Sequence, residues 1–124
     1  MIYGSTREGR FCGKVAEWAI GELAGRREFT VDAIDPATLD LPDRHLRADS
    51  AAVISLRERI GRAEAFLIVT PEYNHSYPAA LKFLIDSVNH QWRAKPVGFI
   101  SYGGIRAACE RWSICGTYSP SCMR

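Results

Sequence analysis

An uninterrupted apolar run, AFLIV at residues 65–69, predicts a buried central strand. Pro71 follows closely, and strand pairing is expected to stop there because proline has no N–H to donate. After a polar, aromatic loop, Pro78 is expected at the first position of a helix. Apolar residues then recur at i, i+3, i+4 and i+7, which predicts one buried helix face: Leu81, Leu84, Ile85 and Val88. In open α/β sheets, a strand, a loop and a helix N-terminus in this order commonly bind an anionic or polar ligand.

The N-terminal part of the chain predicts a strand, a helix and a second strand. Residues 1–3 are an apolar stub, which indicates either a very short first strand or a start codon assigned too late. A helix is expected from Gly13 or Lys14 to Ala24, because apolar residues recur on one face there. Residues 29–34 alternate apolar and polar positions, which predicts a half-buried strand.

The remaining segments continue the alternation. Residues 35–49 contain two prolines and many charges, and we expect a loop there. Asp49 or Ser50 is a candidate N-cap for a helix that reaches Ala63, and residues 96–101 form a last strand candidate. The resulting order, β-α-β-α-β-α-β, predicts an α/β fold in which helices cover both faces of a parallel sheet.

Composition adds few constraints. The 124 residues are 47% apolar and 24% charged, with a formal net charge of +2, which is ordinary for one globular domain. No basic arm suggests nucleic acid, and no apolar run approaches the roughly 20 residues of a membrane span. No signal peptide is visible, so a cytoplasmic protein is expected. The four cysteines match no common zinc or redox spacing, and we expect no metal site.

The segment GSTREGR at residues 4–10 follows the first strand and precedes the first helix, where such folds bind phosphate. Ser5 and Thr6 offer hydroxyl groups, and Arg7 and Arg10 offer charge-assisted bonds to phosphate oxygens. The spacing fits neither a Walker loop nor a G-x-G-x-x-G fingerprint. The alternative is a solvated turn that carries two surface arginines.

Three stretches of the sequence together resemble one enzyme family. PEYNHSYPAALKFLID, at residues 71–86, resembles the signature of the NAD(P)H-dependent FMN reductases, flavodoxin-like enzymes that include quinone, azo and chromate reductases. GSTREGR resembles the FMN phosphate loop of that family, and SYGG at residues 101–104 resembles a loop that borders the flavin. The resemblance covers roughly residues 2–105.

The resemblance implies a flavodoxin-like three-layer fold, FMN as cofactor and NADPH or NADH as co-substrate. Hydride passes from NAD(P)H through the flavin to an acceptor: a quinone, a free flavin, an azo compound or a metal oxyanion. No catalytic acid–base residue is expected, because the cofactor carries the chemistry. The implied cofactor contacts are Ser5, Thr6, Arg7, Arg10, Phe11 and Cys12; Pro71, Glu72, Tyr73, Asn74 and His75; and Ser101, Tyr102, Gly103 and Gly104. Family members form homodimers or homotetramers, for which the helix after Pro78 is a candidate interface.

The segment after Ile105, RAACERWSICGTYSPSCMR, has no clear helical or strand period. If one base is restored after the Ile105 codon, the shifted frame can read ISGGLRAVEHLRHVFAELHA, which supplies the Gly-Gly-Leu-Arg-Ala motif of the family and an amphipathic helix. We therefore expect residues 1–105 to form a partial FMN-binding domain that lacks its last strand and helix, and residues 106–124 to be an out-of-frame tail. Two alternatives remain open: an FMN-binding electron carrier without NAD(P)H activity, and a non-functional fragment.

Overall fold

The computed structural model describes residues 1–42, 44–45 and 50–103 of the chain. The segment 104–124, which includes Gly104 and the expected out-of-frame tail, lies outside the described residues.

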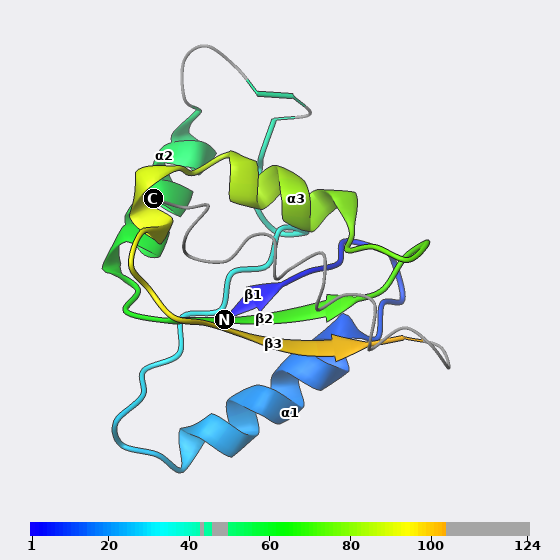
Figure 1. Cartoon of the computed structure of the whole chain (residues 1–124), viewed down its shortest axis with the longest axis vertical. Coiled ribbons are helices and arrows are strands. Elements are labelled where there is room, and N and C mark those ends of the chain that lie inside the picture. The colour runs from blue at the N-terminus through cyan, green and yellow to red at the C-terminus, as the bar shows by residue number, and fades with distance from the viewer. Residues whose placement is uncertain (43, 46–49, 104–124) are drawn as a thin grey trace.

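A parallel three-stranded sheet forms the centre of the described fold (Figure 1). Its strands are β1 (Ile2–Tyr3), β2 (Phe66–Pro71) and β3 (Val97–Tyr102), in the spatial order β1-β2-β3. The register pairs Ile2 with Ile68 and, on the other side of β2, Ile68 with Phe99. The predicted central strand is confirmed, and β1 has only two residues, which is consistent with both interpretations of residues 1–3.

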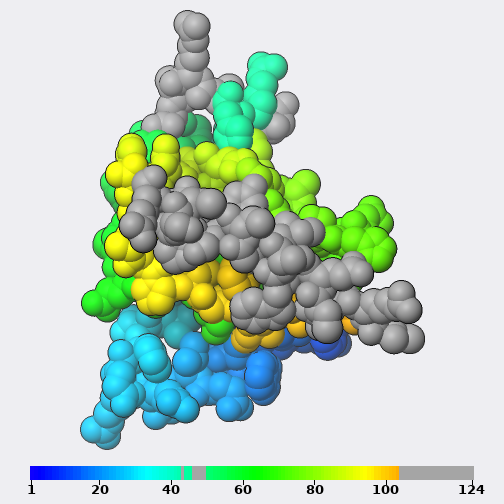
Figure 2. Space-filling view, viewed as in Figure 1, coloured from blue at the N-terminus to red at the C-terminus, as the bar shows by residue number. Residues whose placement is uncertain are grey.

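Helices cover both faces of the sheet, as the alternating pattern predicts. They are α1 (Cys12–Ala24), α2 (Ala51–Arg62), α3 (Ala79–Asp86) and the short 3₁₀ helix η1 (His90–Trp92). Helix α1 lies on one face, whereas α2 and α3 lie on the opposite face (Figure 1). The space-filling view shows the same division, with the blue residues of α1 on one side of the molecule and α3 and η1 on the other (Figure 2).

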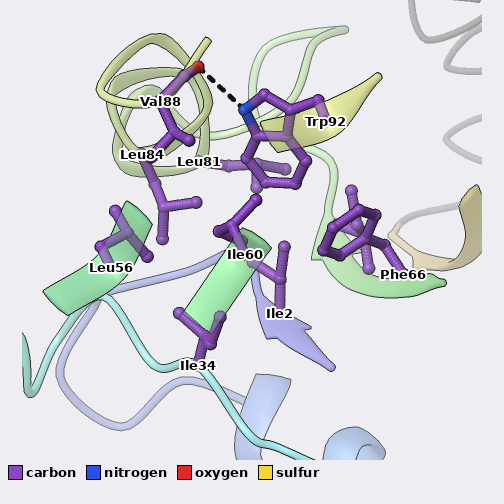
Figure 3. Packing of buried hydrophobic residues seen from close by; sticks show 10 residues of the cluster. Ile2, Ile34, Leu56, Ile60, Phe66, Leu81, Leu84, Val88 and Trp92 are labelled. Carbon is purple, nitrogen blue, oxygen red and sulfur yellow. Dashed lines mark hydrogen bonds between the residues drawn. The ribbon is translucent and has the colours of Figure 1, made fainter. Parts of the chain in front are cut away.

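Strand β2 separates two apolar clusters because its side chains alternate between the two faces of the sheet. Phe66 and Ile68 belong to the larger cluster, under α2 and α3, whereas Val69 packs with Cys12 and Ala16 of α1. The larger cluster includes Ile2, Ile34, Leu56, Ile60, Leu81, Leu84, Val88 and Trp92 (Figure 3).

Trp92 closes the larger cluster at the C-terminal end of α3. Its indole N–H donates to the Val88 carbonyl at 2.9 Å (Figure 3). The indole nitrogen also lies 3.2 Å from the Ile85 carbonyl oxygen. The ring packs on Phe66 with 4.7 Å between centroids. Trp92 therefore satisfies carbonyl groups at a helix end while it fills the core.

The prediction of a strand over residues 29–34 is wrong, because the structure has only one isolated bridge in this segment. Ile34 makes a single parallel bridge with Ile2, in which Tyr3 N donates to Ile34 O at 2.9 Å and Ile34 N to Met1 O at 2.8 Å. Phe29, which the alternation placed on the buried face, is 56% exposed. The two residues of β1 offer too few partners for a longer ladder. The bridge nevertheless places this segment outside β1, as in the flavodoxin-like strand order.

Strand β2 ends at Pro71, as predicted, although Pro71 itself is still paired. Pro71 pairs with Tyr102, and the next residue, Glu72, donates its N–H to Tyr102 O at 3.0 Å. Phe66 N likewise points to the β3 side, where it donates to Pro96 O. The backbone N–H groups of even-numbered residues in β2 thus point toward β3, and those of odd-numbered residues point toward β1. Pro71, which has no N–H, is odd-numbered, and β1 has already ended at this level, so no hydrogen bond between the strands is lost.

Helix boundaries agree with the predictions to within about two residues. Ser50 is the N-cap of α2, since its Oγ accepts from Val53 N at 3.3 Å. Pro78 is the N-cap of α3 and not its first helical residue, so the helix begins at Ala79. Val88 lies beyond the end of α3 but is buried in the larger cluster as the pattern required.

Two isoleucines of α2 provide a test of the larger cluster. Ile60 is fully buried, whereas Ile54 is 46% exposed. We expect Ile60→Ala to lower the free energy of unfolding by about 2–5 kcal/mol, because it removes buried methyl groups and leaves a cavity. Ile54→Ala should lower it by less than about 1 kcal/mol. Urea unfolding followed by circular dichroism would measure both, and equal losses would contradict the described packing.

Candidate functional site

Two loops and the end of β3 meet at one edge of the sheet, because the carboxyl ends of parallel strands lie together. Residues 4–11, the first loop, connect β1 to α1, and residues 72–78, the second loop, connect β2 to α3. Gly103 follows β3 at the same edge. The structure therefore brings together the three stretches that carry the family resemblance.

The first loop leaves the sheet through a contact that excludes any side chain at Gly4. Gly4 N donates to Val69 O at 2.7 Å. A Cβ atom at Gly4 would lie 2.8 Å from both Cβ and Oγ1 of Thr70 and 2.9 Å from Val69 O. Thr70 is itself buried in β2. Glycine is therefore required here by close packing, and the direction of the first loop follows from it.

Ser5 and Arg7 of the first loop both contact Tyr73 of the second loop. The Ser5 and Tyr73 hydroxyl oxygens lie 2.8 Å apart, and Ser5 is fully buried. The Arg7 guanidinium lies over the Tyr73 ring, 4.0 Å from its centroid, in a cation–π contact. Arg7 N also lies 3.4 Å from Ser5 Oγ. These contacts hold the two loops as one unit.

The tip of the second loop is a tight two-residue turn. Tyr73 N donates to Ser76 O at 2.8 Å, and Ser76 N donates back to Tyr73 O at 3.0 Å. Asn74 and His75 between them both have positive φ, 51° and 61°, which is the geometry of a type I′ turn. A Glu72 side-chain oxygen accepts from His75 N at 2.9 Å, which adds a third hydrogen bond to the turn.

Arg10 is bound to Asp35, outside the loop. Its Nη1 donates to Asp35 Oδ1 at 2.8 Å, and its Nη2 pairs with Asp35 Oδ2. The same Nη1 donates to the Ser5 carbonyl. The hydrogen bond to Asp35 is the main cause that raises the pKa of Arg10, so this guanidinium is firmly charged and its charge is compensated locally.

Aromatic residues border the site next to the start of α1. Phe11 and Tyr102 meet edge to face with 5.8 Å between ring centroids. Burial, followed by the nearby Cys12, raises the pKa of Tyr102, so its hydroxyl stays protonated. The Cys12 side chain points into the core, where Sγ lies 3.4 Å from Val69 O. Any contact of Cys12 with a ligand would therefore come from its backbone.

The other predicted site residues lie around this centre. Thr6 and Gly103 are exposed, Pro71 is buried in β2, and Ser101 pairs with Thr70 at the end of β3. Asn74 and His75 form the exposed tip of the second loop. Gly104 lies outside the described residues.

Sequence reasoning missed two residues that shape the site. Thr70 lies in the buried run of β2 and packs against Gly4, and Asp35 holds Arg10. Asp35 stands directly after the segment predicted as the second strand, and this position at a strand end was the available signal.

Comparison with known proteins identifies the family. The family model described as NADPH-dependent FMN reductase matches residues 1–113. The chain belongs to this family. Among curated relatives, an NAD(P)H-dependent FMN reductase of Schizosaccharomyces pombe is 34% identical over 118 residues, covering 84% of this chain and 56% of that protein. A quinone reductase of Escherichia coli is 38% identical over 90 residues, covering 68% of this chain and 46% of that protein.

Solved structures agree on the fold. An NADH:FMN oxidoreductase in its apo form superposes with a TM-score of 0.77 at 21% identity, covering 98% of this chain and 66% of that one. A flavoenzyme NAD(P)H:(acceptor) oxidoreductase of Paracoccus denitrificans gives a TM-score of 0.74 at 26% identity, covering 94% and 67%. The flavodoxin-like fold is thus confirmed. The chain spans about half the length of the curated relatives described above.

The close packing at Gly4 predicts an asymmetric response of two glycines to alanine. Gly4→Ala should lower the free energy of unfolding by about 1–3 kcal/mol, because the new Cβ overlaps Thr70 and the Val69 carbonyl. Gly21→Ala, in the middle of α1 with nothing within 4 Å of the added Cβ, should raise it by about 0.5–1 kcal/mol. Urea titrations of both variants measure the difference. A neutral Gly4→Ala would show that the first loop leaves the sheet differently.

Proposed function

We propose that this chain forms the FMN-binding part of an NAD(P)H-dependent oxidoreductase that reduces quinones or related acceptors. The observation that supports it most is the joining of the first and second loops through Ser5, Arg7 and Tyr73, at the edge where this fold binds ligands. The names of the relatives support FMN, a pyridine nucleotide and a quinone as the reaction partners.

The residues of the first loop suit the phosphate end of FMN. Helix α1 begins at Cys12 without a side-chain cap and without an acidic residue in its first turn, so its N-terminus is suited to an anion. Arg7 and Thr6 are exposed beside it and offer a guanidinium and a hydroxyl group. We assign Ser5, Arg10 and the turn around Phe11 and Cys12 to the same end of the ligand. This set of donors fits a dianionic phosphate.

The second loop and the end of β3 suit the flat ring of the flavin. We assign ring contacts to Pro71, Glu72, Tyr73, Asn74 and His75 on one side and to Ser101, Tyr102, Gly103 and Gly104 on the other. When bound, FMN supplies the capacity to accept a hydride and to pass the electrons on. The protein residues bind and orient the ring and exclude water, and none is assigned as an acid or base.

Several wider properties are proposed on the family resemblance. The acceptor class includes quinones, free flavins, azo compounds and metal oxyanions, and the intact enzyme is a homodimer or homotetramer that uses α3 as an interface. We place it in the cytoplasm. Within the described part of the chain, no helix is long and apolar enough to cross a membrane.

Arg7→Ala tests the phosphate assignment. We expect the dissociation constant for FMN to rise about tenfold to a hundredfold, because a charge-assisted contact is lost. Affinity for riboflavin, which has no phosphate, should barely change. Quenching of flavin fluorescence measures both constants.

Arg27→Ala is the matched control for this substitution. It removes the same charge from an exposed position just beyond the opposite end of α1, and should leave both flavin affinities unchanged. If Arg7→Ala and Arg27→Ala bind FMN equally well, the phosphate has been misplaced.

We also propose that residues 1–105 form a partial FMN-binding domain and that residues 106–124 are read out of frame. The chain as printed and a chain with the restored frame should therefore differ. Both chains are expected to bind FMN and quench its fluorescence. The frame-restored chain should consume NADPH or NADH faster when a quinone is added. Absorbance at the pyridine-nucleotide band follows the reaction.

The outcomes of this comparison separate the alternatives. FMN binding by both chains without any NAD(P)H consumption would favour an electron carrier. Binding by the frame-restored chain alone would make the printed chain a non-functional fragment. The gene sequence tests the frame directly, since intact codons without a family-like alternative frame would contradict the proposal.

A further inference from the structure

The Arg10 guanidinium is held by contacts within the protein, which a residue that only bound phosphate would not require. The Arg10 guanidinium contacts three separate parts of the fold: the Asp35 carboxylate, the Ser5 carbonyl and the Tyr3 ring, whose centroid lies 5.7 Å away. The Arg10 and Asp35 side chains are only 18% and 17% exposed. A guanidinium held in this way has little freedom to turn toward a ligand.

Asp35 is itself fixed by its own turn. Its Oδ1 accepts from Ala37 N at 2.9 Å, and its carbonyl accepts from Thr38 N and Thr38 Oγ1, both at 3.0 Å. The preceding residue, Ile34, is buried and bridged to β1. The carboxylate therefore stands at a defined position relative to the sheet, and a bidentate pair transmits that position to Arg10.

The hydrogen bond from Arg10 to the Ser5 carbonyl fixes the first loop relative to Asp35. Ser5 is the buried residue whose hydroxyl reaches Tyr73, and Arg7 N lies near the same hydroxyl. Arg10 N in turn donates to the Arg7 carbonyl at 3.2 Å. Arg7 is thus the exposed cation of the loop, whereas the charge of Arg10 is already compensated by Asp35.

We infer that Asp35 is a positioning residue for the phosphate-binding loop: it holds Arg10 as a brace on the Ser5 carbonyl, and Arg7 is the cation that meets the phosphate. This inference rests on the proposed FMN site. It differs from a direct role for Arg10 in a way that can be measured. Removing the Asp35 charge should favour an anion by electrostatics alone, but it should disfavour the anion if the loop loses its support.

The test uses the full chain with Asp35→Asn, which keeps the shape of the side chain and removes its charge. We expect FMN affinity to fall about tenfold or more, riboflavin affinity to change much less, and amide hydrogen exchange of residues 4–11 to speed up in the ligand-free protein. FMN affinity that is unchanged or higher, or loop exchange that is unchanged, would overturn the inference.

A similar ion pair three residues earlier provides the control. Asp32 accepts from Arg59 through both carboxylate oxygens, on the same connecting segment as Asp35. Asp32→Asn should leave loop exchange and the ratio of FMN to riboflavin affinity unchanged. An equal effect of both substitutions would mean that the segment is merely loosened, and would also overturn the inference.

Two further variants keep the test decisive if Asp35→Asn fails to fold. Arg10→Lys keeps the positive charge but not the planar fork, so it should lose FMN affinity if Arg10 is a brace and keep most of it if Arg10 contacts phosphate. Asp35→Glu should restore part of the affinity. A wild-type chain that binds no FMN would refute the proposed function. Amide hydrogen exchange requires no ligand, so exchange in residues 4–11 would still test whether Asp35 and Arg10 hold the first loop in place.

Discussion

The pairing of β1 with its two neighbours is the interaction on which the site depends. Only Ile2 and Tyr3 form this strand, yet Ile2 pairs with Ile68 on one side and bridges Ile34 on the other. Ile2 is fully buried in the larger cluster, while Tyr3 packs toward α1. One short strand thus sets where the first loop begins and where the segment that carries Asp35 ends. A displacement of this strand would move both partners of the Arg10–Asp35 pair.

The two arginines of the first loop have different electrostatic environments. Arg10 is compensated by Asp35 and turned toward the backbone, whereas Arg7 lies against the face of Tyr73. A buried or half-buried cation needs an anionic partner to offset the loss of hydration. An exposed cation on an aromatic face is not neutralised by that contact, so it can still attract an anionic ligand. The loop can therefore be rigid and still present a positive charge at the sheet edge.

Local pattern was sufficient for much of the fold and for predicting that the candidate stretches lie at one edge of the sheet. Interactions within a few residues determine three of the predicted features: the strand formed by the apolar run before Pro71, the helix after Pro78, and the N-cap at Ser50. The three loops could be placed at one edge because parallel strands end together. The pattern over residues 29–34 failed because a ladder requires a partner of matching length, and β1 has two residues. The contacts of Asp35 with Arg10 and of Ser5 with Tyr73 could not be predicted from the sequence, since the two members of each pair are distant along the chain.

The turn at Asn74 and His75 has a consequence for the thermodynamics of binding. Both residues already hold positive φ, with two backbone hydrogen bonds and the Glu72 carboxylate closing the turn. The conformational entropy of ordering this loop is therefore lost when the chain folds and not when a ligand arrives. A flat ligand that meets this loop would find its contact surface already formed, so association would carry little ordering entropy and the second loop would discriminate by shape.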